Sequence, residues 1–116
     1  YVYKRQVSIL DRFLEHQRIY VFGDGRDTTV YMSSADLMER NIDWRVEVAF
    51  PVLDPELRRQ VIDMVQIQVR DNSKARRLDR LQCNKYVLNR KGVHRTQYET
   101  YDYFARLEKK QEKLSV

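Results

Sequence analysis

Three short segments near the middle of the chain alternate apolar and polar residues as strands do. They are residues 18–22, 28–32 and 45–50, and the first is rich in β-branched and aromatic side chains. Between the first two lies the segment 23–27, where glycine supplies the positive backbone φ that a tight hairpin needs. Three strands this close together, joined by turns, predict a largely antiparallel sheet. Every other element must be placed around that sheet.

Small and polar residues interrupt the pattern where the second strand should end. Ser33 and Ser34 are too short and polar to prolong a strand, and alternation resumes only at Arg45. His16 precedes the first strand, and Asn41 lies in the connection. Imidazole exchanges a proton near neutral pH, and arginine binds phosphate through two parallel hydrogen bonds. We therefore expect these five residues to meet at one end of the sheet and to form a phosphate site.

Each of the five residues also has a structural interpretation. A lone histidine such as His16 is more often structural, and Ser33 and Ser34 serve equally well as turn residues. Arg45 could instead form a surface salt bridge with an acid at position 43 or 47, and Asn41 suits an orienting hydrogen-bond partner better than a ligand. The residues by themselves leave these alternatives open.

Helices are predicted on either side of the sheet segments. Residues 8–15 carry a serine N-cap and an apolar face at helical spacing, which predicts a short helix. Asp54, Pro55 and Glu56 are typical of a helix start. Apolar residues then recur at helical spacing to about residue 70, so this helix should pack one face on the sheet as core.

The C-terminal third is predicted to be helix, loop and helix. A short helix is expected over residues 74–81 and a loop over residues 84–92. The last helix should begin at Thr96, which forms a capping box with Glu99. Beyond residue 107 the chain is rich in lysine and glutamate and is expected to fray into solvent.

Size and composition allow one compact domain. The chain has 116 residues, of which 42% are hydrophobic, so it is long enough for one core and too short for two domains. Cys83 is the only cysteine, which excludes an internal disulfide, and one cysteine with two distant histidines lacks the spacing of a zinc site. No apolar run approaches the roughly 20 residues of a membrane span, so the cytoplasm is the expected location. We expect a domain over residues 7–116, taken from a longer protein, with residues 1–6 outside it as sequence that need not be native.

Longer stretches resemble known families. A histidine, a cation two residues later and a small polar motif resemble half of a phospholipase D superfamily site, although Arg18 replaces the lysine and S-S-A-D (33–36) replaces G-S-x-N. The segments F-L-E-H-Q-R-I-Y-V-F (13–22), V-Y-M-S-S-A-D-L-M-E-R-N-I-D-W-R-V-E-V (30–48) and P-V-L-D-P-E-L (51–57) resemble more closely the C-terminal domain of bacterial polyphosphate kinases of the long-chain-synthesising type. D-N-S-K-A-R (71–76) and Y-E-T-Y-D-Y (98–103) are similar to its later segments. The resemblance covers nearly the whole chain and implies an α/β, phospholipase D-like half-domain, with a mixed, largely antiparallel sheet flanked by helices.

The resemblance implies a phosphotransferase. Enzymes of this family reversibly transfer the γ-phosphate of ATP to inorganic polyphosphate, with Mg²⁺, through a phosphohistidine in the preceding domain. His16 matches the second histidine of the site, the predicted catalytic residue here, which contacts the nucleotide phosphates and can assist proton transfer. Arg45 matches an arginine that reaches the same phosphates, and Ser33, Ser34 and Asn41 complete the predicted ATP and phosphate site. Mg²⁺ ligands are expected mostly outside this chain, which should bind ATP, ADP or polyphosphate rather than turn over alone. The parent enzyme is expected to be a cytoplasmic homo-oligomer, with membrane association left open.

A basic run follows the predicted central helix. Residues 70–95 carry nine lysines and arginines against two acids, a net charge of +7 that exceeds the +5 of the whole chain. Five of the cations form a predicted polyanion track: Arg70, Lys74, Arg76, Arg77 and Arg80. A polyanion would bind such a track with strong salt dependence, whereas the alternative is a solvated basic face. His94, within this run, is expected on the surface, and Cys83 is expected to be inert.

Two functions of other classes compete with phosphoryl transfer. A phosphodiesterase or nuclease of the phospholipase D type would cleave a diester without ATP, but Arg18 in place of lysine and the displaced Asp24 argue against it. A nucleic-acid-binding module could use the basic run. The sequence carries no recognition-helix, RNA-binding or zinc-finger motif to support that function.

Overall fold

The computed structural model describes residues 6–23 and 25–114. Residues 1–5, to which the expectation of non-native sequence mostly applies, and Asp24 of the predicted turn lie outside the described residues. The chain forms two compact units. We call residues 15–65 the central unit, and residues 1–14 together with 66–116 the terminal unit.

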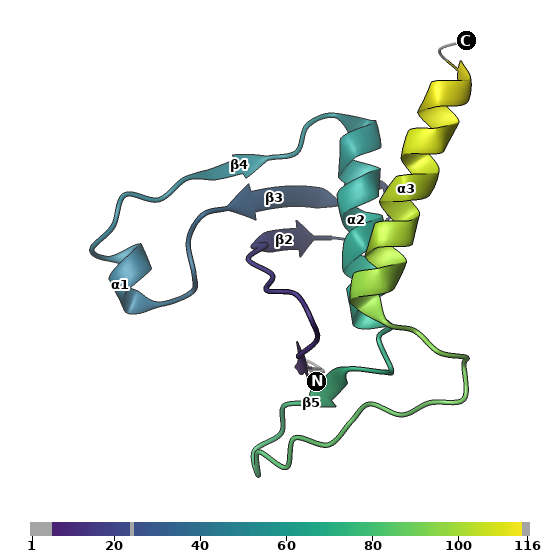
Figure 1. The fold of residues 1–116 in the computed structure, drawn as a ribbon. Coiled ribbons are helices and arrows are strands. Elements are labelled where there is room, and N and C mark those ends of the chain that lie inside the picture. The colour runs from purple at the N-terminus through teal and green to yellow at the C-terminus, as the bar shows by residue number, and fades with distance from the viewer. Residues whose placement is uncertain (1–5, 24, 115–116) are drawn as a thin grey trace. The chain divides into compact units, whose positions relative to one another are not determined.

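The central unit is built on a three-stranded antiparallel sheet (Figure 1). Its strands β2 (Ile19–Phe22), β3 (Thr29–Ser33) and β4 (Ala49–Pro51) lie in that order, with Tyr20 opposite Tyr31 and Met32 opposite Phe50. A 3-10 turn, η1 (Gly25–Asp27), joins β2 to β3. The predicted hairpin and the antiparallel sheet are confirmed. Val30, in the middle strand, is 1% exposed and forms the centre of this unit's small core.

The third strand is shorter than predicted. Only Ala49–Pro51 pairs with β3, while residues 45–48 are irregular and Val46 is fully exposed, so the strand predicted over residues 45–50 is wrong for its first four residues. A single helical turn, α1 (Glu39–Ile42), lies in the connection beyond the end of β3 (Figure 1). Residues 45–48 leave the ladder because the Glu47 carboxylate and the Val48 N–H bond to the side chain of Ser34, just beyond the end of β3.

The helix predicted after β4 is confirmed as α2 (Pro55–Val69). Its N-cap is Asp54, whose Oδ1 accepts hydrogen bonds from the N–H groups of Glu56 and Leu57, both at 2.9 Å. The prediction that its apolar stripe is core is only partly correct. Ile67 is the buried residue of α2, whereas Leu57 and Val69 are mostly exposed.

Two predicted helices of the terminal unit are absent, and strands take their place. β1 (Val7–Ile9) pairs antiparallel with β5 (Ala75–Arg77), with Ser8 opposite Arg76. After β1 the chain stays irregular, because its polar groups bond to residues 84 positions away. Asp11 accepts hydrogen bonds from the Arg95 guanidinium at 2.9 and 2.7 Å, which lower the pKa of its carboxyl. Gln97 pairs with both the N–H and the carbonyl of Phe13, at 2.9 and 2.7 Å.

The last helix, α3 (Thr96–Leu114), begins where it was predicted. The capping box is not formed, because Glu99 bonds to Arg70 and His94, and the Thr96 hydroxyl donates to the carbonyl of Ile67 at 3.5 Å. The expected fraying beyond residue 107 is also wrong, since the helix continues to Leu114. Within the described residues, no helix combines the length and the apolar character that crossing a membrane requires.

Candidate functional site

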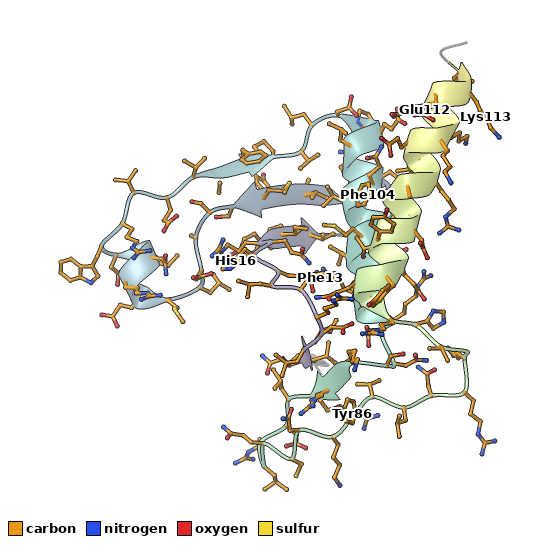
Figure 2. All side chains as sticks on the ribbon, in the orientation of Figure 1. Phe13, His16, Tyr86, Phe104, Glu112 and Lys113 are labelled. Atoms are coloured by element: carbon orange, nitrogen blue, oxygen red, sulfur yellow. The ribbon has the colours of Figure 1, made fainter. Side chains whose placement is uncertain are left out.

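One edge of the central sheet gathers most of the predicted site. Because the strands are antiparallel, the start of β2, the end of β3 and the chain entering β4 share this edge. Backbone hydrogen bonds extend the pairing there: Ser33 N–H donates to the Arg18 carbonyl at 3.0 Å, and Ser34 N–H to the Val48 carbonyl at 2.9 Å. His16 lies just before β2, and its side chain is exposed (Figure 2). The sheet therefore positions the predicted residues through its topology.

A hollow of about 390 Å³ lies at this edge. The residues that line it include three of the predicted set, Ser33, Asn41 and Arg45, together with Tyr20 and Glu47. Its surface mixes a cation, an amide and hydroxyl groups with one carboxylate, that of Glu47, which accepts a hydrogen bond from the Ser34 hydroxyl. Such a set suits an anion with several oxygen atoms, since each can accept a hydrogen bond. His16 and Ser34 belong to the same edge but are not among the residues that line this hollow.

Asn41 is the buried polar group behind Arg45. It is 2% exposed, and its Oδ1 lies 3.5 Å from Nη1 of Arg45. Its amide Nδ2 is buried without a hydrogen-bond partner among the described residues. The ion pairs found within residues 6–23 and 25–114 do not include Arg45, so the alternative salt bridge at position 43 or 47 is not formed there. This geometry leaves the Arg45 charge available, with Asn41 as its neighbour.

The two serines hold the connection in shape. The Ser33 hydroxyl accepts a hydrogen bond from the Ala35 N–H at 3.1 Å. The Ser34 hydroxyl donates to the Glu47 carboxylate and accepts from the Val48 N–H at 3.0 Å. These bonds draw the chain before β4 towards the end of β3. The structure thus gives both serines the turn role that the sequence left open.

Arg18 and Asp36 form an ion pair that sequence analysis did not predict. Arg18 Nε donates to Asp36 Oδ1 at 2.7 Å, and Arg18 Nη1 donates to the His16 carbonyl at 3.0 Å. The hydrogen bond from Arg18 lowers the pKa of the Asp36 carboxyl, and the same bond raises the pKa of Arg18. Arg18 therefore braces the backbone at His16. The only sequence signal was the acid at the end of the S-S-A-D motif.

The predicted polyanion track lies in the terminal unit and is not uniform. Arg70 pairs with Glu99 at 2.8 Å, and Arg76 lies over the ring of Tyr86 at 4.6 Å. Lys74 is half-buried, whereas Arg77 and Arg80 are exposed and line a second hollow. Arg70 is therefore paired with an acid of the same unit. The other four cations of the track are in none of the ion pairs found among the described residues.

His94 is not a simple surface residue, contrary to expectation. Its side chain is 29% exposed, and its ring nitrogens lie 2.8 Å from Glu99 Oε1 and 3.0 Å from the Lys91 carbonyl oxygen. It ties the loop before α3 to the first turn of that helix. Cys83 is a free, exposed thiol.

Comparison with known proteins decides the family. Residues 4–97 match the family described as polyphosphate kinase C-terminal domain 2. The chain belongs to this family. Polyphosphate kinases of Klebsiella pneumoniae and Yersinia pestis are 51% and 52% identical to it, over 106 and 103 residues that cover 90% and 87% of the chain. The chain spans about 15% of the length of these relatives.

A solved structure has the same fold. The crystal structure of polyphosphate kinase from Porphyromonas gingivalis matches with a TM-score of 0.87 and 44% sequence identity. The match covers 91% of this chain and 16% of that one. It confirms the predicted α/β class with antiparallel strands and helices. The family predicted from the sequence is confirmed as well.

Proposed function

We propose that this domain is the C-terminal catalytic portion of an ATP:polyphosphate phosphotransferase, which reversibly transfers the γ-phosphate of ATP to inorganic polyphosphate. The observation that carries the proposal is the shared sheet edge. The chain belongs to the polyphosphate kinase family, and the residues that the resemblance assigns to nucleotide phosphates lie just before β2, at the end of β3 and in the connection from β3 to β4. A phosphohistidine in the preceding domain would complete the site.

Phosphoryl transfer asks a protein chiefly to position the reacting groups and to neutralise charge on oxygen. Arg45 supplies the charge at the hollow, and the buried Asn41 beside it limits where the guanidinium can lie. His16 supplies an imidazole that can donate a hydrogen bond to a phosphate oxygen or exchange a proton near neutral pH. Arg18 holds the backbone of His16 in place.

Magnesium belongs to the proposal only as the companion of ATP, whose phosphates it neutralises when bound. Among the described residues, no three histidine, cysteine, aspartate or glutamate side chains gather as a metal ion requires. Two carboxylates at this edge of the sheet are already engaged, Asp36 with Arg18 and Glu47 with Ser34. The residues present do not fit a resident ion, and we assign no step of the reaction to one.

The test is His16→Ala in the intact enzyme, assayed for formation of polyphosphate from ATP. We expect a loss of about 100-fold or more, because removal of a general acid–base or phosphate-contacting group costs about 10²–10⁴ in rate. Gln17→Ala changes the neighbouring exposed residue and should leave the rate within about twofold. A His16→Ala enzyme with near-normal synthesis would refute the proposal.

The same preparation separates the competing functions. Hydrolysis of a generic phosphodiester without ATP would indicate the phospholipase D-type activity instead. We further propose a cytoplasmic, homo-oligomeric parent enzyme, which cell fractionation and light scattering of the intact protein would check.

A further inference from the structure

The terminal unit carries a second hollow, of about 860 Å³, beside β5. The chain leaving β5 forms one wall, with Arg77, Asp79 and Arg80, and the returning chain contributes Gln82 and Asn84. We call residues 76–85 the basic loop. Figure 2 shows Tyr86, the residue after this loop, beside β5.

Hydrogen bonds to backbone groups fix the conformation of the basic loop. Asp79 Oδ1 accepts hydrogen bonds from the N–H groups of Leu81 and Cys83, both at 3.1 Å. Gln82 and Asn84 have positive φ angles of 50° and 53°, which reverse the chain. The returning chain is then fixed to β5, since Arg77 N–H donates to the Lys85 carbonyl at 2.8 Å. Asp79 is the only acid in this loop, and one of its carboxylate oxygens is therefore occupied by hydrogen bonds within the turn.

The charge of this region is strongly positive and unpaired. Residues 74–91 carry seven lysines and arginines against one acid. None of the ion pairs among residues 6–23 and 25–114 uses a cation of the basic loop. Arg76 donates to the Tyr86 hydroxyl at 2.9 Å and lies over its ring, which orients the guanidinium without neutralising it. Of the cations of the basic loop, Arg77 and Arg80 line the hollow itself.

The aromatic content decides which polyanion fits. Single-stranded nucleic acids gain much of their affinity by stacking bases on aromatic side chains. Tyr86 is the only Phe, Tyr or Trp between positions 74 and 95, and the Arg76 guanidinium lies over its ring. What remains is a cluster of guanidinium and ammonium groups, which recognises phosphate oxygens through charge-assisted hydrogen bonds and supplies no row of aromatic rings for successive bases.

We propose that the basic loop is a polyphosphate-holding subsite, in which Arg77 and Arg80, the two cations that line the hollow, bind phosphates of a long chain. This inference rests on the proposed function for its ligand, and it adds a role that the transfer site does not need. A chain held at a second place stays bound between successive transfers, so the subsite favours long products.

The test replaces two exposed cations, as Arg77→Gln/Arg80→Gln, in the intact enzyme. Binding of long-chain polyphosphate should weaken roughly tenfold at low salt, because two charge-assisted contacts are lost. The slope of log affinity against log salt should become shallower by about 1.4, at about 0.7 for each phosphate contact. Products resolved on gels should be shorter, while transfer to a short oligophosphate acceptor keeps its rate.

Two further variants serve as controls. Lys109→Gln/Lys110→Gln removes the same charge from exposed positions of α3 and should change neither affinity nor product length. Arg77→Lys/Arg80→Lys keeps the charge and should retain most of the binding, which separates loss of charge from loss of folding.

Three results would each refute a different claim: the subsite, its ligand or the proposed function. Unchanged salt dependence and unchanged product length in Arg77→Gln/Arg80→Gln would refute the subsite. Equal binding of a single-stranded DNA of matched length, lost in the same variant, would refute the choice of polyphosphate. Failure of the wild-type enzyme to make polyphosphate would refute the proposed function alone, because variant-sensitive binding of polyphosphate would still be measurable.

Discussion

The side chain of Asp71 connects three segments of the terminal unit. Asp71 is 1% exposed, and its Oδ1 accepts hydrogen bonds from the N–H groups of Ser73, Lys74 and Ala75 at 2.7–3.0 Å. Oδ2 accepts the N–H of Thr96 at 2.8 Å. One side chain thus joins the end of α2, the start of β5 and the first residue of α3.

The substitution Asp71→Asn tests this junction with almost no change in shape. The amide keeps one oxygen for the Oδ1 bonds, but its NH₂ group replaces Oδ2 and faces the Thr96 N–H. Loss of a charge-assisted hydrogen bond costs about 1.5–3 kcal/mol, and an unsatisfied buried donor costs about 1–3 kcal/mol more. We expect the free energy of unfolding to fall by about 2.5–6 kcal/mol, a large part of the 5–15 kcal/mol typical of a domain.

Urea unfolding of the 116-residue chain, followed by far-UV circular dichroism, measures this loss. With a slope of about 1–2 kcal/mol per molar urea, the midpoint should fall by about 1 M or more. The Thr96 amide should also exchange its hydrogen faster. Asp79→Asn is the matched control, because that carboxylate accepts two backbone N–H groups in an exposed turn and its loss should cost less than about 1 kcal/mol. Equal stability of the Asp71→Asn and wild-type chains would refute this account of Asp71.

The same junction predicts the direction of the pH dependence. Burial acts to raise the pKa of Asp71, but the hydrogen bonds from the backbone N–H groups of Thr96, Lys74 and Ala75 outweigh it and leave the pKa below the ordinary value of 3.8. A lowered folded-state pKa means that the ionised group contributes its full stability above pH 3.8. That contribution is lost as the pH falls below 3.8, and Asp71→Asn should remove this part of the acid sensitivity.

Two smaller predictions concern the ends of elements. Gly23→Ala should cost about 1–3 kcal/mol in the same unfolding assay, because φ is +80° and the new Cβ would lie 2.8 Å from the Asp27 carbonyl oxygen; Gly92→Ala, at φ +86° with open space around it, should cost less, and equal losses would show that the contact does not matter. Asp54→Ala should cost about 1 kcal/mol by leaving two N–H groups of α2 uncapped, whereas Asp54→Ser should recover most of it.

Local signals in the sequence predicted the elements that depend on local interactions. The hairpin of β2 and β3 follows from alternation and from glycines with positive φ at positions 23 and 25. The start of α2 follows from the Asp54 cap, whose hydrogen bonds span only two and three residues. The start of α3 at Thr96 was correct for a partly wrong reason, since the N–H of Thr96 bonds to Asp71 and the capping box does not form.

Long-range polar bonds decided the elements that the sequence predicted wrongly. Short helices are predicted over residues 8–15 and 74–81, yet β1 and β5 pair with each other across more than 60 positions. Asp11 and Phe13 bond to Arg95 and Gln97, and Asp71 collects the N–H groups at the start of β5. The spacing of residues within a short stretch of sequence carries no information about such distant partners. In these two segments tertiary contacts therefore override the local helix propensity.

At the candidate site, strand pairing likewise competes with side-chain hydrogen bonds. Residues 45–48 alternate as a strand should, and the ladder of β4 could have continued through them. Instead Ser34 bonds to Glu47 and to the Val48 N–H, so pairing with β3 ends early. Arg45 consequently lies outside the ladder, beside the buried Asn41 and the hollow, rather than in a fixed register opposite β3. A strand prediction that fails next to a cation and an unpaired buried amide is therefore itself an indication of a binding site.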